Sequence, residues 1–229
     1  MTNIEQVASA RVRHSSFVID SSFVIRHSSF RVGGAFTLIE LIVVVTVIVI
    51  LVGLILSTVG YVQKKGARAR AETEIAALSA ACESYKADNG VYARGPATAM
   101  TVGSTTIPAN VTDNLDAKTK GDPTNTTTPT YGQTSLYLYT QLSGDLAGNQ
   151  QATSKSYFTF KPQMLAIDTY GYVTAIKDPF GNSYGYSTVQ QTGTTTAGYN
   201  PTFDLWSTAG LTTNPPNPDT ITPQWIKNW

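Results

Sequence analysis

The chain is poor in the side chains that most enzymes use for chemistry. It has 229 residues with one cysteine, Cys82, and two histidines, His14 and His27. Residues 36–229 therefore contain no histidine, so they cannot build a Ser-His-Asp triad, a Cys-His dyad or a His-ligated zinc site. One cysteine also excludes an internal disulfide. Paired carboxylates stay open as catalysts, but no spacing of acids indicates them, and we expect that this protein is not an enzyme.

Charge is scarce as well. Only 14% of the residues are charged, and the formal net charge is +1. Residues 1–35 contain four arginines and two acids, so the 16 basic and 15 acidic groups of the whole chain fall to 12 and 13 in residues 36–229. This balance gives no support to a nucleic-acid partner.

Against this background stands one long apolar run, Phe36 to Tyr61, in which Glu40 is the only charged residue. At about 1.5 Å per residue, a helix over this run is roughly 39 Å long, which exceeds the roughly 30 Å of a bilayer core. In lipid the backbone must satisfy its own hydrogen bonds, so a lone span is helical. We predict a single membrane helix.

Glu40 is costly in such a run, and two interpretations stay open from the residue alone. It can lie at the headgroup level with its carboxylate in water, or it can have a partner and a task within the membrane.

The residues around Glu40 carry a resemblance. Ala35 to Leu41, AFTLIEL, resembles the processing site of type IV pilins and type II secretion pseudopilins. The resemblance implies that a prepilin peptidase cuts on the cytoplasmic side between Ala35 and Phe36, and that Phe36 is then N-methylated. The family prefers glycine before the cut, and here Gly34 lies one position earlier, so cleavage after Gly34 stays an alternative.

The resemblance also implies an assembly role for Phe36 and Glu40. A free α-amino group at Phe36 is a cation at neutral pH. In lipid, this ammonium and the Glu40 carboxylate of a neighbouring subunit each relieve the other's desolvation. Such pairing sets the axial register of a helical filament.

Beyond the run, the sequence predicts that the helix continues. Ile75, Leu78, Cys82 and Tyr85 step by three, four and three residues, which is one apolar stripe on a helix. Asp88-Asn89-Gly90 is a typical end, with Gly90 as the left-handed cap. We expect Cys82 to be a small core residue.

The remainder predicts a domain with little helix. Residues 93–134 are rich in Thr, Pro, Asn and Gly and indicate a long surface loop with a short helical turn near residues 111–118. Residues 135–143 indicate a short helix, and residues 157–160 a strand.

The C-terminal region carries a second resemblance. Residues 178–181 have the composition of a type I turn, and residues 183–189 and 201–207 alternate as strands. Together, DPFGNSYGY, FDLWSTAG and ITPQWIKNW resemble the major pseudopilin of type II secretion. The similarity covers residues 36–92 and 176–229.

In that family the loop after these strands binds calcium, which prefers six to eight oxygen ligands. The resemblance implies Leu205, through its carbonyl, Ser207 and Asp219 as ligands. The loop at residues 211–222 has one carboxylate and several prolines, so a proline-stiffened loop without metal is the alternative that we favour. We expect Trp206, Trp225 and Trp229 to pack this loop onto the sheet.

The resemblance implies an α+β pilin fold, in which a long N-terminal helix, continuous with its transmembrane part, packs on a small C-terminal antiparallel β-sheet. We predict five segments. They are a cleaved leader (1–35), the membrane and assembly half of the helix (36–61), its amphipathic half (62–92), a variable region (93–175) and the C-terminal sheet and loop (176–229).

The implied function is that of a structural subunit of a type II secretion pseudopilus, which forms a homopolymer to drive secretion. Its partners are the prepilin peptidase, minor pseudopilins and the inner-membrane assembly platform. The implied location is the bacterial inner membrane, with the N-terminus cytoplasmic and the domain periplasmic, before assembly into a periplasmic or cell-surface filament. The alternatives are a type IV pilin for adhesion, motility or DNA uptake, and a membrane-anchored carbohydrate- or ligand-binding domain.

Overall fold

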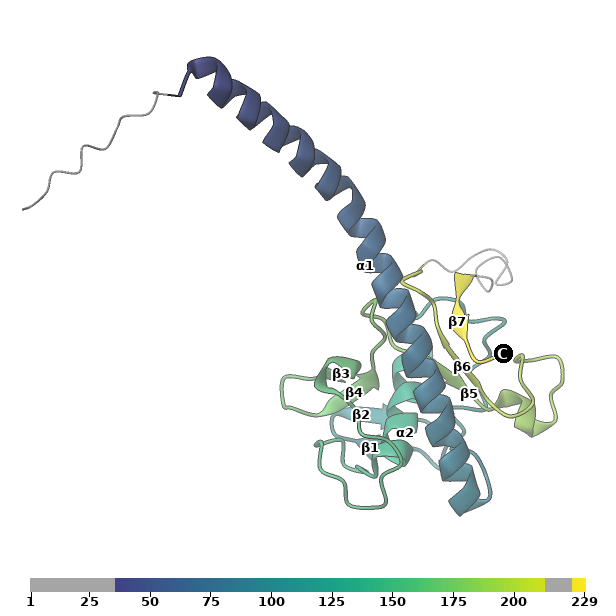
Figure 1. Ribbon diagram of the computed structural model, residues 1–229. Coiled ribbons are helices and arrows are strands. Elements are labelled where there is room, and N and C mark those ends of the chain that lie inside the picture. The colour runs from purple at the N-terminus through teal and green to yellow at the C-terminus, as the bar shows by residue number, and fades with distance from the viewer. Residues whose placement is uncertain (1–35, 213–223) are drawn as a thin grey trace, which may run out of the picture. The chain divides into compact units, whose positions relative to one another are not determined.

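The computed structural model describes residues 36–212 and 224–229 (Figure 1). The chain divides into two compact units, one ending at Leu51 and one covering Val52–Trp229. Helix α1, Leu38–Asn89, contributes residues to both units.

Helix α1 has the predicted amphipathic continuation. Three members of the predicted stripe, Ile75, Leu78 and Cys82, are buried, and Tyr85 is partly buried against the same core. The helix ends at Gly90, whose φ is 76° and whose N–H donates to the carbonyl four residues back at 2.7 Å. Glycine adopts this left-handed conformation without the clash that a Cβ makes. The predicted cap is confirmed.

Glu74, which belongs to one of the two ion pairs on the polar side of α1, also links the helix to the rest of the domain. Arg68 pairs with Glu72 at 3.2 Å, and Arg70 pairs with Glu74 at 3.5 Å. Glu74 also accepts a hydrogen bond from the Tyr184 hydroxyl at 2.8 Å. Exposed i,i+4 pairs contribute only a few tenths of a kcal/mol, so the hydrogen bond to Tyr184 matters more for position than the ion pair does.

The predicted short helix is present as α2, Tyr131–Ser143, and begins four residues earlier than expected. Thr130 Oγ1 accepts from the Gln133 N–H at 3.1 Å, and Gln133 Oε1 accepts from the Thr130 N–H at 3.0 Å. This reciprocal capping box fixes the start of the helix. Its residues precede the apolar pattern, which is why the pattern alone placed the start too late.

The segment expected as a surface loop is more ordered than predicted. It contains an antiparallel hairpin of β1, Met100–Val102, and β2, Thr105–Ile107. The last residue of each strand is fully buried. Residues 111–118 contain no helix, but the Asn110 carbonyl accepts from the N–H groups of Asp113 and Asn114 at 3.0 and 3.2 Å, so the predicted short helical turn is present as a single hydrogen-bonded turn. A few isolated apolar residues anchor this Thr-rich segment, and they give no periodic signal.

The predicted C-terminal strands are present in shorter form. Strand β5, Gly185–Ser187, pairs antiparallel with β6, Asp204–Ser207, and β6 also pairs antiparallel with β7, Ile226–Lys227. The first two strands lie within the predicted ranges 183–189 and 201–207.

A second pair of strands lies earlier in the chain. Strand β3, Leu165–Ile167, pairs antiparallel with β4, Val173–Ile176. The strand predicted at residues 157–160 is wrong, because the N–H groups of its first two residues donate to the Leu142 carbonyl at the end of α2. Short 3-10 turns cover Pro162–Met164 and Val189–Thr192.

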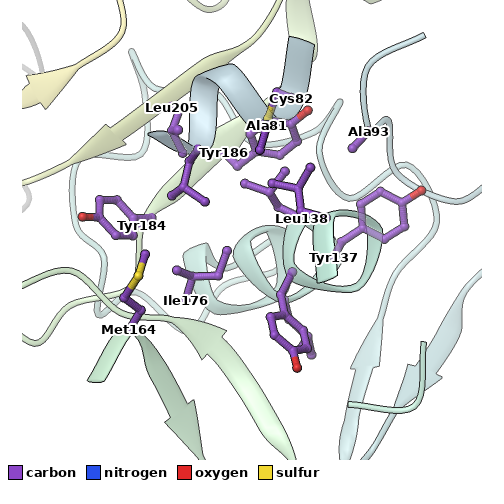
Figure 2. Packing of buried hydrophobic residues seen from close by; sticks show 14 of the residues in the cluster. Ala81, Cys82, Ala93, Tyr137, Leu138, Met164, Ile176, Tyr184, Tyr186 and Leu205 are labelled. Atoms are coloured by element: carbon purple, nitrogen blue, oxygen red, sulfur yellow. The ribbon is translucent and has the colours of Figure 1, made fainter. Parts of the chain in front are cut away.

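One apolar core joins these elements (Figure 2). It contains Cys82 of α1, Leu138 of α2, Ile176 of β4, Tyr186 of β5 and Leu205 of β6. Burying such a side chain stabilises the fold by about 1.5–3 kcal/mol. The chain is therefore an α+β protein with one long apolar helix and small antiparallel sheets, and the prediction that Cys82 is a core residue is confirmed.

A test of this packing is the close contact between β5 and β6. An ideal Cβ at Gly185 lies 2.2 Å from Cε2 of Trp206, the residue paired with it. Because the buried ring cannot move away, we expect Gly185→Ala to lower the free energy of unfolding by about 2 kcal/mol or more. Urea unfolding of the full chain in detergent, followed by tryptophan fluorescence, measures this change.

Gly66→Ala is the matched control. A Cβ at Gly66 meets nothing within 4 Å, and alanine is the better helix former by about 1 kcal/mol. We expect this variant to be as stable as the wild type or slightly more stable. Equal stability of the two variants contradicts the packing described here.

Candidate functional site

The first turn of α1 holds the predicted assembly residues. The Thr37 N–H and the Thr37 hydroxyl each donate to Glu40 Oε2 at 2.8 Å. In return, Thr37 Oγ1 accepts from the Glu40 N–H at 3.3 Å. This is a capping box, which satisfies backbone donors at the start of the helix. The assignment of Glu40 to pairing between subunits missed this local role, although T-L-I-E fits the capping pattern.

Glu40 lies beside an open apolar surface. Phe36, Ile39, Val43 and Val44 line a shallow groove of about 360 Å³ next to it. Phe36 is 83% exposed. The carboxylate therefore borders a surface that lipid or a second chain can cover.

The apolar surface extends along the helix. Every large apolar side chain from Leu38 to Val62 is exposed, and α1 is long and apolar enough to cross a membrane. Each such side chain left in water forgoes about 1.5–3 kcal/mol. Such a surface is favourable only where lipid or another protein surface covers it.

The hydroxyl groups within the run need no outside partner. Thr46, Ser57 and Thr58 donate to carbonyls three or four residues back in the same helix, at 2.8, 2.7 and 3.0 Å. Internal hydrogen bonding is what a helix in lipid requires. Glu40 is therefore the one charged group of the run that lipid has to accommodate.

The processing site is only partly described. Gly34 and Ala35 lie outside the described residues, and Phe36 is the first residue inside them. Cleavage before Phe36 stays a prediction.

The predicted calcium ligands are also only partly described, because Asp219 lies outside the described residues. The Leu205 carbonyl accepts from the Asn228 N–H at 3.2 Å, and the Ser207 hydroxyl donates to Asp178 Oδ2 at 2.5 Å. Both residues are fully buried. In the described part, Leu205 of β6 is bonded to Asn228, and Ser207 of β6 is bonded to the turn at Asp178. These two residues do not by themselves form an open cation site. The calcium prediction stays untested.

Asp178 is a residue whose importance the sequence concealed. Its Oδ1 accepts from the N–H groups of Phe180 and Asn182 at 3.0 and 2.9 Å, and its carbonyl accepts from Gly181 at 3.0 Å. The predicted turn is therefore confirmed, and its carboxylate also accepts from Ser207. Burial raises the pKa of Asp178 above its ordinary value. The composition indicated the turn, but nothing local indicated the link to Ser207.

The tryptophans form an aromatic cluster. Trp206 and Trp225 stack with ring centres 5.9 Å apart, and Trp229 stacks on Tyr199 at 4.8 Å. Trp206 Nε1 donates to the Tyr131 hydroxyl at 3.0 Å. Trp206 and Trp225 are buried, so these two rings are not offered to a ligand. Most of the loop that they were expected to hold, residues 211–222, lies outside the described part, so this prediction stays untested.

The described residues offer little for catalysis. Burial raises the pKa of the Cys82 thiol far above its ordinary value, so it stays protonated and unreactive. Within residues 36–212 and 224–229, no three His, Cys, Asp or Glu side chains gather as a metal site. The feature that stands out is the exposed helix.

Asp204 gives a pH test of the sheet beside Leu205. Its buried carboxylate accepts N–H groups from Tyr199 and Asn200 at 2.9 and 2.8 Å. Burial raises its pKa to about 6 from 3.8. Because the folded state binds this proton more tightly than the unfolded state, the contribution is present below about pH 4 and is lost as the pH rises through about 6.

We therefore expect Asp204→Asn to gain stability relative to the wild type between pH 4 and pH 7, by up to about 3 kcal/mol. Urea unfolding at both pH values measures the two free energies. Asp168→Asn is the control, because a hydrogen bond from Ser104 lowers the pKa of the Asp168 carboxyl and keeps it ionised over this range. A pH-independent difference for Asp204→Asn contradicts the prediction.

Comparison with known proteins adds no family to these observations. No family model, curated protein or solved structure matches the chain. A functional assignment therefore depends on the residues and the geometry described above.

Proposed function

We propose that this chain is a structural subunit of a type II secretion pseudopilus, cut before Phe36 and polymerised through its N-terminal helix. The observation that carries the proposal is the exposed apolar surface of α1 from Leu38 to Val62, with one carboxylate, Glu40, in the first turn of the helix. The sequence AFTLIEL at the same place supports it.

Cleavage changes the chemistry at the start of the helix. It converts the Phe36 amide into an amine, which is a cation at neutral pH. Thr37 donates to Oε2 of Glu40, so Oε1 is the oxygen through which Glu40 accepts the ammonium of a neighbouring copy. In lipid each charge offsets the desolvation of the other. One such pair for each subunit fixes the offset between adjacent helices.

Before assembly, the apolar part of α1 lies in the inner membrane, with the N-terminus cytoplasmic and the domain periplasmic. In the filament the same surface is covered by the helices of other copies. The prepilin peptidase, minor pseudopilins and an inner-membrane assembly platform are the partners that this function requires.

Two alternatives are less well supported. A type IV pilin shares the helix, but pilins often have a C-terminal disulfide, which a chain with one cysteine cannot form internally. A membrane-anchored carbohydrate- or ligand-binding domain would use exposed aromatic rings; Trp206 and Trp225 are buried, although Tyr170 is exposed.

Processing gives the first test of this function. We expect the protein extracted from membranes to begin at Phe36 and to be about 14 Da heavier than the unmodified mature chain, because of one methyl group. Intact mass and N-terminal sequencing, with and without the prepilin peptidase, measure this. A start at Met1 in both strains overturns the proposal.

Glu40→Gln separates the two roles of Glu40. Glutamine keeps the capping box, since Glu and Gln both serve at this position, but it removes the charge. We expect this variant to insert in the membrane and to assemble at least about tenfold less, because an unpaired buried ammonium costs more than 1.4 kcal/mol. Filament yield in sheared-cell fractions measures assembly.

Thr37→Val is the matched control. This variant removes the hydroxyl of the capping box and keeps the charge of Glu40. We expect assembly to fall by no more than about threefold, in line with about 0.5 kcal/mol for a weakened cap. If Thr37→Val abolishes assembly and Glu40→Gln does not, Glu40 serves the helix cap alone and the charge-pairing mechanism is wrong.

A further inference from the structure

A groove of about 490 Å³ lies beside α1 where its apolar run ends, within the unit Val52–Trp229. One wall is the helix, with Tyr61, Lys64, Lys65 and Arg68. The opposite wall is largely apolar and includes Phe180 and Leu211. Among the described residues, no Asp or Glu lines it. We name it the basic groove.

The basic wall belongs to the stripe by which α1 packs on the domain. Lys64 and Arg68 precede Ala71 and Ile75 at helical spacings of four, three and four residues, so all four share one face. Ala71 and Ile75 are buried, whereas Lys64 and Arg68 are exposed. The face that is apolar over the core thus becomes cationic where it passes the groove.

These cations are only partly neutralised. Arg68 pairs with Glu72 and donates to the Gln224 carbonyl at 3.0 Å. Lys65 Nζ lies 4.9 Å from the centre of the Tyr61 ring. Lys64 forms no ion pair with any residue that the structure describes. Counted over the residues that the structure describes, the groove therefore carries surplus positive charge next to an apolar wall.

The groove also lies at a particular level of the helix. Tyr61 and Val62, both 64% exposed, are the last residues of the apolar surface. If the run lies in a bilayer, the next helical turn is at the headgroups, where tyrosine is typically found. Basic side chains at this level attract anionic lipids.

We infer that the basic groove binds the phosphate headgroup of an anionic phospholipid in the membrane that holds α1. Lys64, Lys65 and Arg68 contact the phosphate, and Phe180 and Leu211 contact the apolar part of the lipid next to it. This inference rests on the membrane placement of α1 in the proposed function, and it adds a ligand class that the function does not require.

The test uses the full chain in nanodiscs made from equal amounts of phosphatidylglycerol and phosphatidylethanolamine. Native mass spectrometry counts the lipids that stay bound after release. We expect the wild type to retain phosphatidylglycerol preferentially. The triple variant Lys64→Gln, Lys65→Gln, Arg68→Gln should lower the ratio of bound phosphatidylglycerol to phosphatidylethanolamine at least about fivefold, which corresponds to about 1 kcal/mol for a single basic residue near an anionic surface.

The matched control replaces Lys86, Lys118 and Lys155 with Gln, which removes the same charge elsewhere on the domain. We expect its lipid ratio to equal that of the wild type. The inference is overturned by a wild type without preference, by a triple variant that keeps the preference, or by a control that loses it equally. If the triple variant keeps the lipid preference but no longer forms filaments, the three cations serve contacts between subunits and not lipid binding.

The two proposals can fail separately. A chain that inserts in nanodiscs and shows no lipid preference overturns the lipid site and leaves the pseudopilus subunit intact. A chain that does not insert at all overturns the membrane helix on which both proposals depend.

Discussion

The apolar surface of α1 between Leu38 and Val62 needs a cover that the described part of the chain does not supply. All of its large side chains are exposed, and leaving them in water is costly. Its hydroxyl groups bond to the helix itself, so the surface suits lipid and the helices of other copies equally. Anchoring in a membrane and the proposed polymerisation are two ways to satisfy this one requirement.

The second unit contains the packed core of the described chain. Burial along α1 begins at Ala71, and from there the helix shares a core with α2 and the C-terminal strands (Figure 2). The link from Ser207 to Asp178 and the stack of Trp206 on Trp225 tie the strands to a turn and to each other. The helix is therefore packed on the core from Ala71 onward, while its apolar side chains from Leu38 to Val62 are exposed among the residues that the structure describes.

Under the proposed function, Glu40 has two electrostatic tasks within one helical turn. It caps its own helix through Thr37, which also keeps the carboxylate near the position of the new N-terminus. A carboxylate already held by one neighbour loses less conformational entropy when it accepts a second. The capping box is thus compatible with the proposed pairing between subunits.

The sequence alone determined the features whose signals are local. The apolar run, the stripe through Ile75, Leu78 and Cys82, and the cap at Gly90 each depend on residues within a few turns of one another, so α1 could be predicted nearly to its ends. The turn at Asp178 followed from its composition for the same reason. Only the tertiary structure decided the hairpin of β1 and β2, the bond from Ser207 to Asp178 and the basic groove. The bond and the groove join residues far apart in the sequence, so no local pattern indicates them. The hairpin is local, but its few isolated apolar residues give no periodic pattern.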